Sequence, residues 1–137
     1  MHIDLNKYSV FVETITSKES NDIDAMIISL RKLQAAGVNA ALAALISTAT
    51  MGMNGEAGEL SEIFKKVIYH GKPFTEETRA HALKELGDII FYWTNACRAL
   101  GLDPNQIIQN NMDKLMARYP GGTFDAHYSA NRAIGDI

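Results

Sequence analysis

Two pairs of acidic residues have both the spacing and the surroundings of a functional site. Glu56 and Glu59 lie three residues apart within MGMNGEAGEL, and Glu85 and Asp88 lie three residues apart within KELGDIIFYW. Residues three apart on a helix are neighbours on one face. Each pair therefore predicts two carboxylates that project together from an otherwise apolar helix surface.

The segment between the two pairs, residues 60–84, is long enough for the end of one helix, a turn and the start of an antiparallel partner. Four carboxylates that converge in a partly dry site repel one another, so we expect a cation among them. Oxygen ligands select a hard cation. The expected ion is Mg²⁺, with Mn²⁺ as a substitute. No histidine or cysteine has a spacing that predicts a zinc or iron site, and His70 and His81 are assigned no role.

The competing interpretation is that these acids are solvated residues in ordinary salt bridges. A single acidic pair would favour that interpretation, because charged residues are mostly exposed. Two pairs on neighbouring helices, each flanked by apolar residues, favour the metal site. A ferritin-like di-iron site would need a Glu-x-x-His pair, whereas the position three after Glu56, Glu59 and Glu85 is acidic in each case.

The elements that must position these acids are helices, because apolar residues recur at helical spacing along most of the chain. No segment alternates as a strand would, so the predicted fold is an all-α bundle of antiparallel helices. We expect one domain, residues 1–137, with a core at about 40–120. The expected elements are N-terminal helices within 1–37 that end near Gly37, a long helix from about Ala40 to Tyr69, a helix from a Thr75 cap to Gly101, a helix that starts at Asp103 and Pro104, and a C-terminal arm, 121–137.

Glycines and a tyrosine near the acids each allow two interpretations. Gly52, Gly55 and Gly58 each cost a helix interior about 0.5–1 kcal/mol relative to alanine. They either let another backbone or a ligand approach beside the acids, or mark a break between two shorter helices near Gly52. Tyr92 follows Asp88 by four residues, so it either hydrogen-bonds substrate or packs in the core.

Basic and amide side chains suited to phosphate occur on two of the expected helices. Lys65 and Lys66 follow the first acid pair, and Asn111, Lys114 and Arg118 are spaced by three and four residues on a later helix. Such a group suits a triphosphate bridged to Mg²⁺. For any single lysine, solvation at the surface is the simpler explanation.

The composition restricts the class of protein. A net charge of -3 argues against a protein that binds a nucleic-acid backbone. Cys97 is the only cysteine, which excludes an intramolecular disulfide, and its apolar helix face predicts a small core residue. The N-terminus lacks a signal pattern and no apolar run reaches membrane-spanning length. We therefore expect a cytoplasmic protein with neither a nucleic-acid nor a membrane partner.

The motifs together resemble a known family. GEAGELSEIFKKV followed by KELGDIIFYW is similar to the MazG-like all-α nucleoside triphosphate pyrophosphohydrolases, whose signature is E-x-x-E, a spacer and E-x-x-D. The downstream NNMDKLMARYPGGTF resembles the segment with which many of these proteins hold phosphate. The resemblance covers about residues 48–124, and residues 1–47 share only a general helical character.

The resemblance implies a reaction, an assembly and a set of site residues. Such proteins are helical bundles that form dimers or tetramers, with sites lined by more than one subunit. They hydrolyse (deoxy)nucleoside triphosphates to the monophosphate and pyrophosphate with Mg²⁺, in nucleotide pool control or house-cleaning. The implied metal ligands are Glu56, Glu59, Glu85 and Asp88, the implied catalytic residues are Glu56, Glu59 and Glu62, and the implied substrate contacts are Lys66, Tyr92, Asn111, Lys114 and Arg118.

Two alternatives remain open at this stage. The first is a related helical pyrophosphohydrolase that acts on phosphoribosyl-ATP or on a dUTP-type substrate, since the metal would act on phosphates that all of these share. The second is a non-catalytic helical oligomer that serves as an interaction module. Clustered acids would then only destabilise the fold, because nothing would offset their repulsion.

Overall fold

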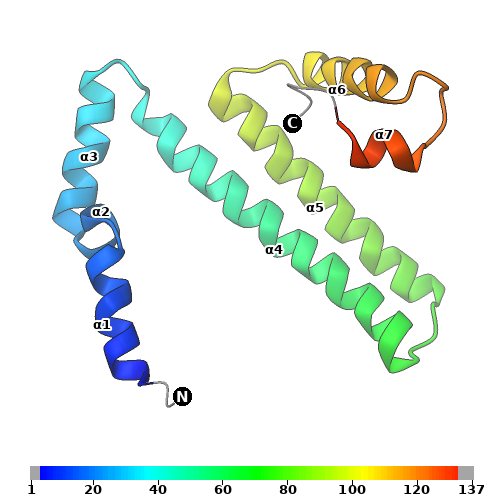
Figure 1. Ribbon diagram of the computed structural model, residues 1–137, viewed down its shortest axis with the longest axis horizontal. Helices are drawn as coiled ribbons and strands as arrows, with labels where there is room; N and C mark the ends of the chain where they lie inside the picture. The colour runs from blue at the N-terminus through cyan, green and yellow to red at the C-terminus, as the bar shows by residue number, and fades with distance from the viewer. Residues whose placement is uncertain (1–3, 133–137) are drawn as a thin grey trace. The chain divides into compact units, whose positions relative to one another are not determined.

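A computed structural model of the chain describes residues 4–132, and every regular element in that range is a helix. The all-α prediction is therefore confirmed for the described residues. Contacts divide the chain into two compact units, Met1–Leu45 and Ile46–Ile137. The helices are α1 (Leu5–Ile15), α2 (Lys18–Asn21), α3 (Ile23–Ala35), α4 (Ala40–His70), α5 (Glu76–Leu100), α6 (Pro104–Arg118) and α7 (Ala126–Ala130) (Figure 1).

The N-terminal unit contains α1, α2 and α3, and aspartates cap its two longer helices. Asp4 Oδ1 accepts the backbone N–H of Asn6 at 3.1 Å, and Asp22 Oδ1 accepts that of Asp24 at 2.9 Å. Such caps satisfy N–H groups that the first helical turn leaves without a partner. The polar segment between α1 and α3 forms the single turn of α2.

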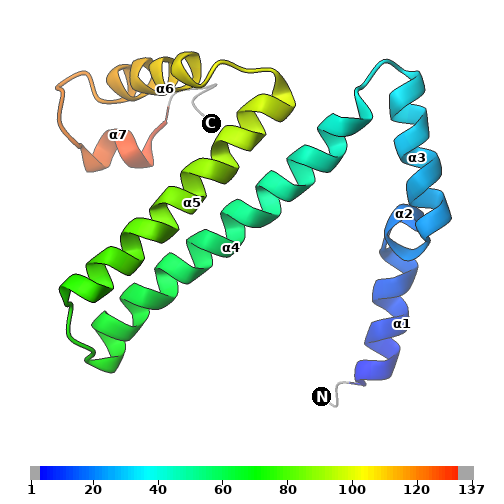
Figure 2. The ribbon, with the colours of Figure 1, turned by 180° about the vertical axis from the view of Figure 1, so that it is seen from behind.

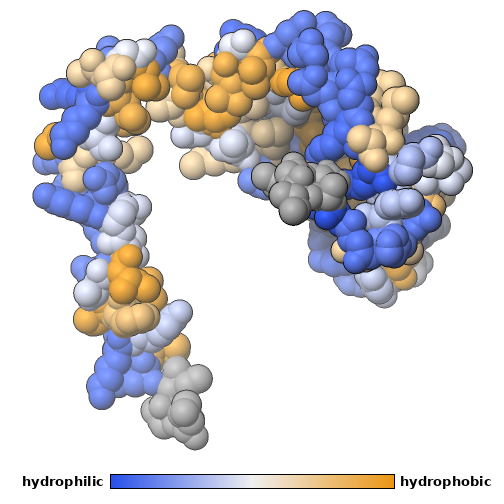
Figure 3. All heavy atoms as spheres, turned by 45° about the horizontal axis from the view of Figure 1, so that its top comes forward, coloured by the Kyte–Doolittle hydropathy of each residue, from blue (hydrophilic) through white to orange (hydrophobic). Residues whose placement is uncertain are grey.

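Large apolar side chains of the N-terminal unit are exposed. Leu5 is 73% and Ile15 66% exposed, and none of the described side chains in this unit is buried. Figure 3 shows apolar surface on these helices as orange spheres. The helical periodicity of this unit is therefore amphipathic, but its apolar side does not form a core within the unit itself.

The main feature of the second unit is an antiparallel pair formed by α4 and α5. We call residues 46–100, which contain the part of α4 in this unit, the turn and α5, the hairpin. The two helices lie side by side and antiparallel when viewed from the front and from behind (Figures 1 and 2). The turn between them uses Gly71, whose φ of 66° favours glycine. Thr75 caps α5 as predicted, because its Oγ1 accepts the backbone N–H of Thr78 at 3.3 Å.

The glycines of α4 behave differently from one another. The helix runs through Gly52 without interruption, so of the two interpretations the break near Gly52 is wrong. A Cβ at Gly52 would lie inside van der Waals contact distance of the Tyr92 ring on α5. Gly52 therefore permits a close approach of the two helices, whereas a Cβ at Gly55 or Gly58 would enter open space.

The C-terminal part of this unit begins where α5 ends. Gly101 has a φ of 65°, and its N–H donates to Arg98 O at 3.3 Å, which closes the helix as predicted. Asp103 Oδ1 then accepts the N–H of Asn105 at 2.9 Å at the start of α6. The expected arm, 121–137, contains the short α7, and residues 133–137 lie outside the described range.

The core of the second unit is small and partly polar. Its buried apolar residues among those described are Ala49, Ile63, Ala82 and Cys97, which confirms Cys97 as a core residue. Glu85 is also buried, with 6% of its surface exposed. None of the described helices is both long enough and apolar enough to cross a bilayer.

Candidate metal centre

The hairpin brings both acid pairs into one site. Glu56 and Glu59 belong to α4, and Glu85 and Asp88 belong to the antiparallel α5. Neighbouring positions on both helices are tightly packed, with Gly52 against Tyr92 on one side of the acids and Ile63 buried on the other. This packing sets the register in which the acids of the two helices meet.

The acids meet in two overlapping clusters. Carboxylate oxygens of Glu56, Glu85 and Asp88 lie within 4.8 Å of one another, and we call this group the oxygen cluster. One ligand atom each from Glu59, His81 and Glu85 also lies within 4.8 Å of the other two, and we call this group the histidine cluster. Glu85 belongs to both, so its carboxylate is the centre of the site.

The electrostatics of the oxygen cluster favour a positive charge. Partial burial raises the pKa of the Glu56 carboxyl above its usual value, and a hydrogen bond to Glu85 raises that pKa further. The nearby charges of Glu59 and Asp88 act in the same direction. Like charges disfavour ionisation at a shared site, and a bound cation reverses that effect. These three carboxylates therefore match the all-oxygen donor set of a hard divalent ion such as Mg²⁺.

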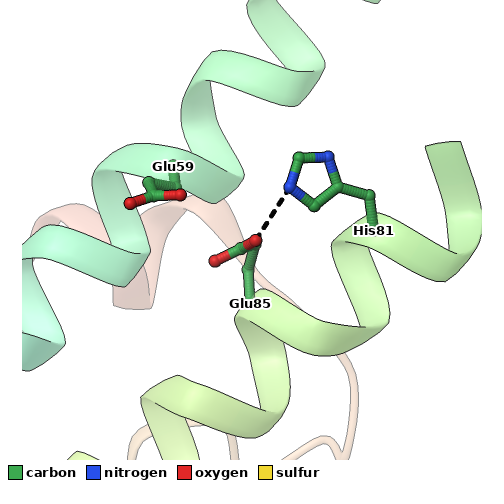
Figure 4. Close-up of side chains that lie close together, drawn as sticks. All are labelled: Glu59, His81 and Glu85. Atoms are coloured by element: carbon green, nitrogen blue, oxygen red, sulfur yellow. Dashed lines mark ion pairs between the residues drawn. The ribbon is translucent and has the colours of Figure 1, made fainter.

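His81 is the functional candidate that sequence reasoning missed. Its Nε2 lies 2.9 Å from Glu85 Oε1, and Figure 4 shows the imidazole on α5 beside Glu85, with Glu59 opposite on α4. The sequence analysis assigned His81 no role, and the structure places its imidazole beside the acids. The available signal was the spacing of four residues between His81 and Glu85, which puts both on one helix face.

Glu62 lies one turn beyond Glu59 but is paired differently. It forms ion pairs with Lys65 and with Lys66, the latter at 3.4 Å. The hydrogen bond from Lys65 is the main cause that lowers the pKa of Glu62, and Lys66 contributes in the same direction. Glu62 is a member of neither cluster. Its predicted role in catalysis remains a prediction.

A groove opens beside the histidine cluster at the turn end of the hairpin. Its volume is about 560 Å³, and it contains the predicted substrate residue Lys66 together with His81. Lys72, in the turn, also lines it and was not predicted. Two lysines and two threonines give this groove groups that bind phosphate oxygens; its lining residues are Ile63, Lys66, Val67, Lys72, Pro73, Thr75, Glu77, Thr78 and His81.

The other predicted substrate residues occupy different positions. Tyr92 is partly buried, with its ring against Gly52 and edge-on to Phe91 at a centroid distance of 5.1 Å. These contacts show that the Tyr92 ring packs between α4 and α5. Its predicted hydrogen bond to substrate remains a prediction. Asn111, Lys114 and Arg118 lie on α6, which follows the far end of α5 from the turn, and Arg118 is partly buried (Figure 1).

Comparisons with known proteins agree with this geometry. A family model described as the MazG nucleotide pyrophosphohydrolase domain matches residues 46–123, more than half of the chain. The match begins where the second unit begins and includes every residue of both clusters. The Gene 37 protein of Mycobacterium phage L5 is 33% identical over 78 residues, which cover 56% of this chain and 68% of that protein. No solved structure matches the chain significantly. The chain therefore belongs to the MazG nucleotide pyrophosphohydrolase family.

Proposed function

We propose that this chain hydrolyses (deoxy)nucleoside triphosphates to the nucleoside monophosphate and pyrophosphate in a Mg²⁺-dependent reaction. The observation that carries the proposal is the convergence of Glu56, Glu85 and Asp88 oxygens within 4.8 Å in the part of the chain that matches the family. Clustered carboxylates at a partly buried site destabilise the fold unless a cation is bound. A divalent ion and a phosphorylated substrate account for them together.

The acids are the proposed ligands of the ion. Glu56, Glu85 and Asp88 would hold Mg²⁺ through their clustered oxygens, and Glu59 would approach from one turn along α4. When bound, Mg²⁺ neutralises charge that develops on the phosphate oxygens and lowers the pKa of a coordinated water. Glu56 or Glu59 would accept the proton that the attacking water releases. Glu62, held in place by two lysines, would orient that water.

Positive and amide groups around the acids are the proposed phosphate and sugar contacts. Lys66 and Lys72 line the groove that adjoins the histidine cluster, so their ammonium groups are available to phosphate oxygens on that side. Asn111, Lys114 and Arg118 are proposed as further contacts from α6. Tyr92 would hydrogen-bond substrate from the acid side of α5 while its ring packs against Gly52.

A homodimer or homotetramer is the proposed assembly. Leu83, Leu86 and Ile90 follow one another at helical spacing on α5 and are 70%, 51% and 59% exposed. Apolar surface of this kind is stabilised by burial against another copy. We further propose that the chain works in the cytoplasm as a single functional domain in nucleotide pool control.

The test is a panel assay with purified protein, Mg²⁺ and each common or modified (d)NTP, in which pyrophosphate and orthophosphate are measured separately. We expect pyrophosphate and monophosphate in equal amounts, lost on chelation of the metal. The Asp88→Asn variant serves as the inactive control, with circular dichroism to establish that its helices remain folded. Release of orthophosphate, or no turnover of any nucleotide, would refute the proposal.

A further inference from the structure

The chemistry of the hairpin changes along its length. Lys66 and Lys72 line the groove at the turn end, and the acid clusters lie further along the two helices. Beyond the acids, the Tyr92 ring packs against Gly52. With phosphate oxygens at the lysines and the metal at the acids, as proposed above, the nucleoside of a bound nucleotide extends toward the end of α5.

Asn95 follows Tyr92 on the acid-bearing side of α5. Asp88, Tyr92 and Asn95 are separated by four and three residues, and this spacing places them on one helix face. A helix rises ~1.5 Å per residue, so Asn95 lies about 10 Å from Asp88 along the axis. Because the sugar separates the base of a nucleotide from its α-phosphate, a nucleotide whose α-phosphate lies at the acids brings its base toward Asn95.

The Asn95 carboxamide is buried, although asparagine is mostly exposed in proteins. Only 9% of its surface is exposed, and its Oδ1 accepts a hydrogen bond from the exposed Arg98 at 2.8 Å. Burial of a carboxamide is unfavourable unless hydrogen bonds compensate for it, and alanine or leucine would favour the helix more. The feature that this costly residue provides is a fixed direction for the Arg98 guanidinium.

From this arrangement we infer that Asn95 and Arg98 recognise the base of the nucleotide. Arg98 contacts the base, and Asn95 is a positioning residue that orients the guanidinium and adds its amide N–H groups. The inference rests on the proposed function, because that function supplies the nucleotide and its direction along the hairpin.

The donors of this pair predict which base is preferred. A guanidinium has no acceptor, and the hydrogen bond to Arg98 uses the Asn95 carbonyl oxygen, so the pair offers N–H donors. Such a pair suits a base edge with two neighbouring acceptors. Guanine presents O6 and N7 in this way, whereas adenine has a donor at N6 beside N7. We therefore expect guanine to be preferred over adenine.

The alternative is that Arg98 only stabilises the end of α5. A cation in the last turn interacts favourably with the helix dipole, and an exposed arginine does so without help from a neighbour. The dipole accounts for the charge of Arg98 but gives no reason for a buried asparagine three residues before it. On this alternative, loss of Asn95 would leave base preference unchanged.

The experiment measures binding of dGMP and of dAMP to the full chain with Mg²⁺ by titration calorimetry. These probes carry the base and the α-phosphate and need no turnover. The variants are Asn95→Leu, which has a similar volume, and Arg98→Met. The matched control is Arg79→Met, which changes another exposed arginine of α5, near the start of the helix. Circular dichroism establishes that all three variants are folded.

We expect the parent chain and Arg79→Met to bind dGMP about 10–100-fold more tightly than dAMP, the discrimination of a good bidentate contact. In Asn95→Leu and Arg98→Met the two Kd values should become nearly equal, because dGMP binding weakens and dAMP binding does not change. A merely structural role of Asn95 would alter the free energy of unfolding but not this ratio. Equal or absent binding of both nucleotides in the parent, a ratio that persists in either variant, or a ratio that is lost in Arg79→Met would each overturn the inference.

The outcome is separable from that of the proposed function. A parent chain that releases pyrophosphate from nucleotides but binds dGMP and dAMP equally keeps the proposed function and loses the recognition pair. A parent chain that prefers dGMP through Asn95 and Arg98 but turns over no nucleotide keeps the recognition pair and loses the proposed reaction.

Discussion

The hairpin and the N-terminal unit are both built from amphipathic helices, yet they depart from ordinary burial in opposite directions. The hairpin buries a carboxylate, because only 6% of the surface of Glu85 is exposed. The N-terminal unit buries none of its described side chains and exposes large apolar residues such as Leu5 and Ile15. The hairpin therefore has a buried carboxylate, whereas the N-terminal unit has exposed apolar side chains.

The two departures have different physical meanings. Exposed apolar surface is non-specific, because any apolar partner that covers it provides the same kind of stabilisation. A buried carboxylate with other acids around it requires a particular partner, since burial of an uncompensated charge costs several kcal/mol. The family match covers the hairpin and leaves out the N-terminal unit. We therefore locate the proposed reaction in the hairpin.

The largest expected effect is on catalysis when the buried acid is changed. Glu85→Gln keeps the size of the side chain but removes the charge that both clusters share. Residues that only support a metal ligand typically contribute 10–100-fold, so loss of this direct ligand should lower kcat/KM by more than about 100-fold. The rate of pyrophosphate release at saturating Mg²⁺, measured over a range of nucleotide concentrations, gives kcat/KM for the variant and the parent.

The matched control lies in the other region. Glu13→Gln changes an exposed glutamate of α1 in the same chemical way and should leave kcat/KM unchanged. If Glu85→Gln retains the activity of the parent, or if both variants lose activity alike, the contrast between the two regions fails as a guide to function.

The next effect is on stability when the ion is added. Mg²⁺ at a hundred times its Kd should raise the free energy of unfolding of the parent by about 2.7 kcal/mol. Asp88→Asn removes one member of the oxygen cluster and should show a much smaller rise, while its metal-free form is at least as stable as the parent because repulsion is reduced. Urea unfolding with Mg²⁺ and with a chelator measures both; an equal rise in the two proteins would contradict the metal site.

A smaller effect should distinguish two glycines of α4. Gly52→Ala places a Cβ against the Tyr92 ring, and such overpacking should lower the free energy of unfolding by about 1–3 kcal/mol. Gly55→Ala enters open space and should raise it by about 0.5–1 kcal/mol, because alanine favours a helix interior over glycine. Urea unfolding of the metal-free proteins measures both changes. A shift of the same sign in both variants would disprove the close approach at Gly52.

The smallest effect concerns Glu62 and pH. The pKa of Glu62 is lower in the folded chain, so its ion pairs with Lys65 and Lys66 add stability above the unfolded value of about 4.3 and lose that contribution as the pH falls through the folded pKa. The parent should therefore exceed Glu62→Gln slightly in stability at pH 7, and the excess should be smaller at pH 3. Chemical unfolding at both values, with and without salt, tests this. A difference that increases toward acid would contradict the ion pairs.

Local sequence signals are sufficient to predict the longer helices and the acids that share a helix face. Apolar periodicity, the Thr75 and Asp103 caps and the glycines at the helix ends predict α1 and α3 to α6, because helix formation depends on residues within one or two turns of each other. The spacing of the acid pairs likewise predicts which carboxylates share a helix face. Only the single turn α2 and the short α7 lacked a signal of this kind.

The way in which the two acid-bearing faces meet depends on the packing of α4 against α5. The register between α4 and α5 depends on the turn near Gly71 and on contacts such as Gly52 with Tyr92, which join residues 40 positions apart. That register buries Glu85, divides the acids into two clusters and adds His81 to one of them. Spacing within one helix carries no information about axial position against another helix. The approach of Glu59 on α4 to His81 and Glu85 on α5 therefore became visible only once the two helices were packed.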